Sequence, residues 1–239
     1  ATTLASKFGT SKKSGAHILE AYNEAGQIAP KLLRRFGITD GNRQTLTLGM
    51  LMTQLINPYR YGLFDLLYDA ESPVGEKLIE YALKEWNHEK HIGETPPQII
   101  REVTMHAAKA VAAIQQIKPT KNNAEFARIK NDMLCYDALA NFYAQKATAA
   151  LSVLRYKYSN DVKDLIAALP SLEKSITYYK RLVALTEGTY LYANSMQTAQ
   201  RKIPMRGVNG TFKKWSEMLV PFESEMNQFK HAIDSIQKN

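Results

Sequence analysis

The stretch from Thr189 to Arg201 holds the densest run of side chains that could bind a polar ligand. If this stretch is helical, residues spaced by four, three and four positions share one face. Those residues are Tyr190, Asn194, Gln197 and Arg201. One aromatic ring, two amides and a guanidinium are suited to a sugar or a carboxylate ligand. The alternative is that the amides satisfy backbone groups of the following loop or face water.

Basic and aromatic residues alternate in a second set of segments, at 34–36, 42–43 and 59–61. Such a patch could hold an anionic glycan, with Arg35, Asn42 and Arg43 as the ligand contacts. The same residues could instead make cation–π and capping contacts within the fold. We favour this second, structural interpretation.

His88, Glu89 and His91 invite comparison with a zinc site. The zinc-peptidase signature needs two histidines four residues apart on one helix. Here they are three apart and fall where a helix should end, before Gly93. Cations at that position suit the C-terminal end of a helix dipole. The sequence therefore predicts a solvated helix end and no metal.

Catalytic motifs are missing from the sequence. Glycoside hydrolysis needs two carboxylates that converge from different elements, and nothing brings together any two of Glu85, Glu89, Glu94 and Glu187. The single cysteine, Cys135, falls inside a long helical pattern, where a thiol is usually inert. There is no nucleophile elbow and no phosphate-binding glycine loop. We predict no catalytic residue and no cofactor.

The elements that must position these residues are helices, because apolar residues recur at spacings of three and four along the chain. Helices are expected at about 14–36, 42–56, 72–86, 95–117, 123–158, 161–187, 189–201 and 221–237. Pro30 should kink the first, and Pro170 should kink or split the helix that contains it. Thr95 and Gln98 have the spacing of a capping box, with proline at the first helical position.

The predicted fold is all-α, an irregular bundle of seven to eight helices. Short connections between long helices predict an up-and-down unit in the second half. A boundary near residues 118–123 would divide the chain into an N-terminal subdomain, 1–122, and a long-helix bundle, 123–239. One continuous domain is the alternative.

Composition narrows the function classes. The chain is 45% hydrophobic and 23% charged, as in ordinary globular proteins. Its net charge of +8 comes from scattered basic dyads, and without a recognisable motif we do not expect a nucleic-acid partner. The longest apolar stretch, 46–56, is far shorter than the roughly 20 residues of a membrane span. The start at Ala1 indicates either removal of a targeting segment or a beginning inside a longer protein.

Residues 16–33, with Pro30 before an apolar turn, resemble a helix that follows the catalytic barrel of α-glucuronidase-like glycoside hydrolases. The stretches 91–103, 128–156 and 185–204 are similar to the C-terminal helical region of large bacterial glycan-degradation proteins. The resemblance implies a catalytic barrel upstream of Ala1 and a periplasmic or secreted location. It transfers no catalytic residue, because no catalytic motif of those enzymes is matched.

Three functions follow from these observations. The first is a non-catalytic helical module of a larger glycan-processing protein, which contributes packing, substrate contacts or oligomerisation. Its partners would be carbohydrate, the upstream catalytic domain and further copies of the chain. The second is a helical scaffold that binds a partner protein through apolar faces. The third, a basic bundle associated with nucleic acid, is the weakest.

Overall fold

The computed structural model describes residues 1–36, 75–190, 194–198, 201–207, 210–212 and 214–238. The helices are α1 (Thr2–Phe8), α2 (Lys12–Ala25), α3 (Ile28–Phe36), α5 (Leu78–Asn87), α6 (Pro96–Gln115), α7 (Asn123–Ser159), α8 (Val162–Thr186), the 3-10 helix η2 (Trp215–Met218) and α9 (Leu219–Gln237). The strands are β1 (Asn194–Thr198), β2 (Arg201–Gly207) and β3 (Gly210–Phe212). Helices supply both hydrophobic cores, so the predicted all-α class is confirmed.

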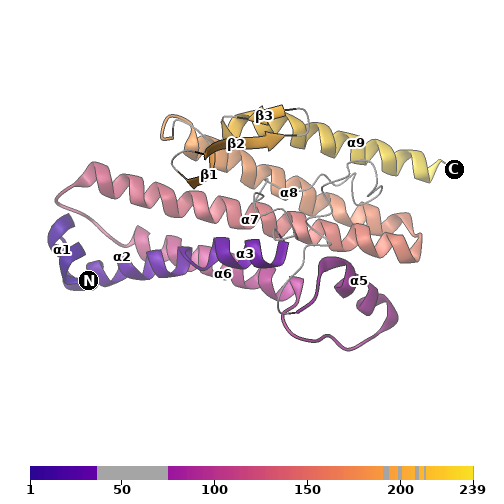
Figure 1. The fold of residues 1–239 in the computed structure, drawn as a ribbon, viewed down its shortest axis with the longest axis horizontal. Helices are drawn as coiled ribbons and strands as arrows, with labels where there is room; N and C mark the ends of the chain where they lie inside the picture. Colours follow the sequence, from indigo (N-terminus) through magenta and orange to yellow (C-terminus); the bar gives the residue numbers. More distant parts are fainter. Residues whose placement is uncertain (37–74, 191–193, 199–200, 208–209, 213, 239) are drawn as a thin grey trace.

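Long helices run side by side along the molecule (Figure 1). The most extensive packing joins α7 to α8, and α6 covers another side of α7. Helix α9 packs on α8, and helix α2 packs on α6. The directions of α7, α8 and α9 alternate (Figure 1), which confirms the predicted up-and-down unit. The division at residues 122 and 123 stays a prediction.

The long helix α7 forms where the sequence predicted it, because its apolar stripe is buried. Met133, Ala140 and Ala147 of that stripe are at most 1% exposed. Alanine is small enough to let the neighbouring helices approach closely. Tyr136 is the exception, at 39% exposed. Tyr136 therefore faces a surface and not the core.

Prolines and caps depart from expectation at Pro30 and at Thr95, whereas a kink at Pro170 stays a prediction. The segment with Pro30 is two helices, since α2 ends before Gly26 and Pro30 lies in the first turn of α3, where its missing N–H costs little. Pro170 lies inside α8, which is not split there. Thr95 is the N-cap of α6 and is followed by prolines, yet its side chain makes no capping hydrogen bond, so the predicted capping box is wrong.

The predicted helix at 189–201 is also wrong. Gly188 adopts a left-handed conformation, with φ 76°, just after α8 ends. The chain then forms β1, β2 and β3 in an antiparallel sheet, in which Ser195 pairs with Ile203 and Arg206 with Thr211. A helical face therefore cannot form there. The helix predicted at 42–56 lies outside the described residues.

Among the described helices, none combines the length and the hydropathy that crossing a membrane requires.

Candidate functional site

The predicted ligand-contact residues separate in the structure. Tyr190 follows α8, Asn194 and Gln197 lie in β1, Arg201 begins β2, and Arg35 lies in the last turn of α3. Asn42 and Arg43 lie outside the described residues. Because the helix that would have aligned four of these side chains is absent from its predicted place, the common face is not formed. A ligand-binding role for each residue remains a prediction.

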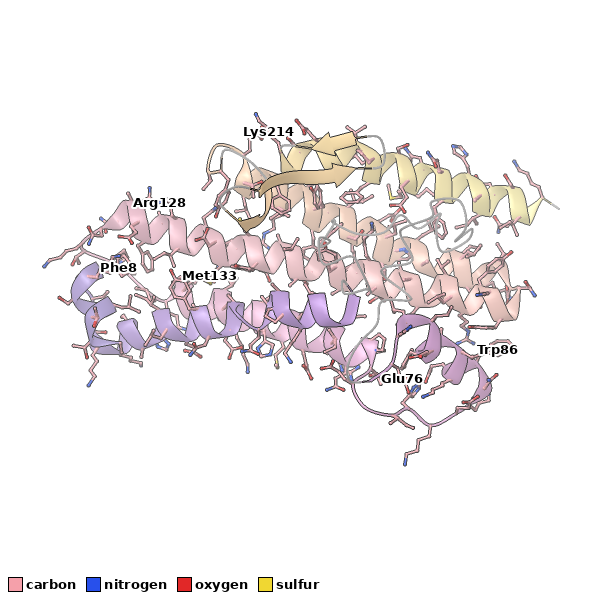
Figure 2. The ribbon with its side chains drawn as sticks, viewed as in Figure 1. Phe8, Glu76, Trp86, Arg128, Met133 and Lys214 are labelled. Atoms are coloured by element: carbon pink, nitrogen blue, oxygen red, sulfur yellow. The ribbon has the colours of Figure 1, made fainter. Side chains whose placement is uncertain are left out.

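Tyr190 lines a groove between α2, α7 and the segment after α8. We call it the Tyr190 groove; it has a volume of about 500 Å³, and its wall includes Tyr22, Asp132, Cys135, Tyr136, Tyr190 and Trp215. Met133, labelled in Figure 2, lies at its base between α7 and α2. Tyr22, Tyr136 and Tyr190 are each about two-fifths exposed. Four aromatic rings around one carboxylate make this groove mainly apolar.

Asp132 sets the electrostatics of the Tyr190 groove. Its carboxylate accepts a hydrogen bond from the hydroxyl of Tyr190. Burial, this hydrogen bond and the negative charge raise the pKa of Tyr190. Burial, aided by Asp132, also raises the pKa of Cys135 to about 11. The thiol is therefore protonated at neutral pH, which fits the inert cysteine predicted from the sequence.

A smaller cavity of about 330 Å³ adjoins the groove and shares Asp132 and Tyr190 with it. Glu125 and Arg128 of α7 complete its polar wall. Arg128 lies near the start of α7 (Figure 2). Glu125 is paired with Lys7 at 2.5 Å, so this cavity presents groups of both charges.

Glu76 forms a polar network that sequence reasoning missed. Its buried carboxylate accepts hydrogen bonds from Lys84 Nζ at 2.7 Å, from His91 Nδ1 at 2.7 Å and from the N–H of Ile92 at 2.8 Å. Burial raises the pKa of Glu76, but these hydrogen bonds outweigh it, and the pKa is lowered overall. The loop before α5 is thereby fastened to the loop after it.

His91 bridges two carboxylates, since its Nε2 atom lies 2.6 Å from Glu85 Oε1 and its Nδ1 atom contacts Glu76. A carboxylate only accepts, so both ring nitrogens must carry hydrogen and the ring is a cation. The hydrogen bonds to Glu85 and then to Glu76 raise the pKa of His91. His88 is an exposed C-cap of α5, as predicted for a helix end, but His91 is not simply solvated.

A pocket of about 570 Å³ lies beside this network, between α5 and the C-terminal part of α7. We call it the Trp86 pocket; its polar and aromatic wall consists of Tyr81, Glu85, Trp86, His88, Ser152 and Arg155. Trp86 lies between the two helices (Figure 2) and stacks on Tyr158, with 6.3 Å between the ring centroids. The indole is 43% exposed. The pocket thus combines an accessible aromatic ring with groups of both charges.

Neither large cavity has the groups of a hydrolytic centre. The Trp86 pocket has one carboxylate, Glu85, and the Tyr190 groove has one, Asp132, among the described lining residues. Glycosidases use two. Across the described ranges, no three His, Cys, Asp or Glu side chains are grouped so that they could hold a metal ion.

A solved structure of a GH138 enzyme targeting pectin rhamnogalacturonan II matches the chain with 47% sequence identity and a TM-score of 0.84. The match covers 99% of this chain. The chain is similar to part of a glycoside hydrolase. It spans 34% of the length of that enzyme, so it corresponds to a partial region of the larger protein. No family model and no curated protein matches the chain.

Proposed function

We propose that the chain is a non-catalytic helical module of a larger glycan-processing protein of the GH138 kind. The observation that carries the proposal is the match over 99% of this chain and only 34% of the enzyme. A catalytic part, such as the barrel implied by the α-glucuronidase-like resemblance, would lie elsewhere in the parent protein. The glycan would be pectic, as for the GH138 relative. A periplasmic or secreted location would suit such a glycan.

The Tyr190 groove supports a role in contacts. Sugar rings stack their C–H faces on aromatic side chains, and Tyr22, Tyr136 and Tyr190 offer exposed rings. We propose that Tyr190, with Asn194, Gln197 and Arg201 of the adjoining strands, meets glycan or the neighbouring part of the parent protein. Arg35, Asn42 and Arg43 would form a second contact.

The purified chain can be tested with pectic oligosaccharides. We expect measurable binding without any release of new reducing ends, because the Trp86 pocket and the Tyr190 groove each have one carboxylate among their described lining residues. Replacing Tyr190 by Ala should weaken binding if its ring stacks on sugar. Tyr190→Phe is the matched control, since it keeps the ring and loses only the hydroxyl that contacts Asp132. Turnover of a glycoside by the purified chain would refute the non-catalytic role.

A helical scaffold is the second candidate, favoured by the apolar wall of the Tyr190 groove. Three half-exposed tyrosines around an apolar groove are also a surface that another protein could cover. Light scattering coupled to size-exclusion chromatography measures the mass of the particle. A dimer in the wild type that becomes a monomer in Tyr136→Ala would favour the scaffold, whereas a monomer in both leaves the groove to glycan or to the parent protein.

A further inference from the structure

We propose that the Trp86 pocket binds an anionic sugar, with the ring stacked on Trp86 and its carboxylate paired with Arg155. The inference rests on the proposed function and names a second site with its own ligand class. Trp86 and Arg155 line the same cavity from α5 and α7. An aromatic ring next to a guanidinium matches a sugar acid, which presents C–H groups on one face and a carboxylate at its edge.

Arg155 contacts Asp164 through one nitrogen atom of its guanidinium. Its Nε atom lies 3.4 Å from Asp164 Oδ1, and the side chain is 68% exposed. The other oxygen of Asp164 accepts a hydrogen bond from Ser159 at 2.5 Å. This side-on contact orients the guanidinium from one edge. A guanidinium has five N–H donors, so one single contact through Nε leaves capacity for a bidentate carboxylate.

Glu85 also lines the pocket, and its negative charge would repel an anionic ligand if it stood alone. The imidazolium of His91 lies 2.6 Å from Glu85 and neutralises it. The ring of Tyr81 stacks on that of His91, with centroids 4.4 Å apart, and so fixes the pair. The carboxylate is thereby available as an acceptor for sugar hydroxyls, while Arg155, which contacts Asp164 through Nε, offers its remaining N–H donors to an acidic group.

Among the described residues that line the Tyr190 groove, none is a cation that could pair with an anion. The charged lining residue of the groove is Asp132, and the adjoining cavity adds Arg128 and Glu125, the latter paired with Lys7 at 2.5 Å. In the groove itself a carboxylated sugar would meet the negative charge of Asp132, whereas in the Trp86 pocket it would meet the guanidinium of Arg155. A pectic glycan that carries carboxylates therefore favours the Trp86 pocket, whereas a neutral ring would fit either site.

The two tryptophans of the chain separate the sites experimentally. Trp86 lines its own pocket, and Trp215 lines the Tyr190 groove. In the Trp215→Phe variant the emission of Trp86 reports on the pocket alone, and in Trp86→Phe the emission of Trp215 reports on the groove alone. Each variant is titrated with trigalacturonate and, as the neutral control, with galactotriose.

We expect trigalacturonate to change the emission of Trp86 with saturation and galactotriose to bind more weakly. Arg155→Gln in the Trp215→Phe background should weaken trigalacturonate binding about tenfold, the loss typical of a charge-assisted hydrogen-bonded pair. It should leave galactotriose unchanged. Lys180→Gln, which also removes an exposed cation of an ion pair but lies outside the residues that line the pocket, is the matched control. Circular dichroism of each variant checks that the helices persist.

Three results would overturn the inference. The first is an unchanged affinity of Arg155→Gln for trigalacturonate, and the second is equal binding of the acidic and the neutral sugar. The third is an emission of Trp86 that does not change during the titration. If Trp86 is silent while the emission of Trp215 responds to either sugar, this site is wrong and the proposed glycan-binding module stands. If both tryptophans are silent, glycan contact by the module fails as well.

Discussion

The ion pair between Lys146 and Glu225 should couple the docking of α9 to α7. Both side chains are almost fully buried, at 1% and 2% exposed, and Lys146 Nζ lies 3.7 Å from Glu225 Oε2. The ammonium also lies 4.4 Å from the centre of the Phe222 ring and 5.5 Å from that of Phe142. Burial lowers the pKa of Lys146, which the charge of Glu225 partly counteracts.

Replacing Lys146 by Met leaves a carboxylate in the core without its cation. Breaking a buried pair from one side costs roughly 3–5 kcal/mol. Loss of the cation–π contact with Phe222 adds about 1–2 kcal/mol, because the site is desolvated. Glu225→Met should cost less than Lys146→Met, since a buried amine can release its proton and become neutral. The double variant should lie within about 2 kcal/mol of the wild type, because methionines fill the space without charge.

Urea unfolding of the four proteins, followed by circular dichroism, gives the double-mutant cycle. For a chain of this length, each kcal/mol lowers the melting temperature by about 2–4 °C. The single variant Lys146→Met should therefore melt roughly 8 °C or more below the wild type. If the double variant is destabilised by the sum of the two single changes, the residues do not act as a pair and the reasoning is wrong.

Four more predictions follow from the structure. Gly75→Ala should destabilise by about 2 kcal/mol or more in urea unfolding, because φ is +90° and a Cβ would lie 1.9 Å from the carbonyl oxygen of Glu94. His91→Gln should reduce the unfolding free energy most below pH 6.5, the ordinary pKa of histidine, and the difference should shrink as the pH rises through the raised pKa of His91. The wild type should lose the contribution of Glu76 to the unfolding free energy as the pH falls from 4.5 through the lowered pKa of this residue. The network should therefore stabilise the fold most between pH 4.5 and pH 6.5. Phe142→Ala should cost about 3–5 kcal/mol and lower the melting temperature, since the ring is 0% exposed at the centre of the main core.

The long helices could be predicted because their stripes persist over many turns. For α7 the prediction, 123–158, differs from the structure by one residue at the C-terminus. Spacing of three and four over more than two turns has few alternatives to a helix. The same rule failed at 189–201, where only four polar positions carried the pattern. The left-handed conformation of Gly188, with φ 76°, ends the preceding helix, and the residues that follow pair as strands. These two features outweighed a helical pattern of only four residues.

The polar network around Glu76 could not be predicted for a different reason. Glu76 and His91 are fifteen residues apart, and they meet only because α5 begins and ends between them. Periodicity describes neighbours within one element and carries no information about two loops that flank it. Gly75 and Gly93, both with positive φ, were the available signals that the chain turns on either side of α5. These glycines indicate where the chain turns, but they do not indicate that Glu76 contacts His91.

The helix α7 determines how the two cavities can cooperate. Tyr136 lines the Tyr190 groove and Arg155 lines the Trp86 pocket. At 1.5 Å per residue, these nineteen positions lie roughly 30 Å apart along one helix. A single sugar ring cannot bridge that distance, whereas a long pectic chain could. Because α7 is packed against α6 and α8 along its length, the spacing is rigid. Binding of a short acidic oligosaccharide should therefore leave the Tyr190 groove free, and contact of one molecule with both sites should need a longer chain.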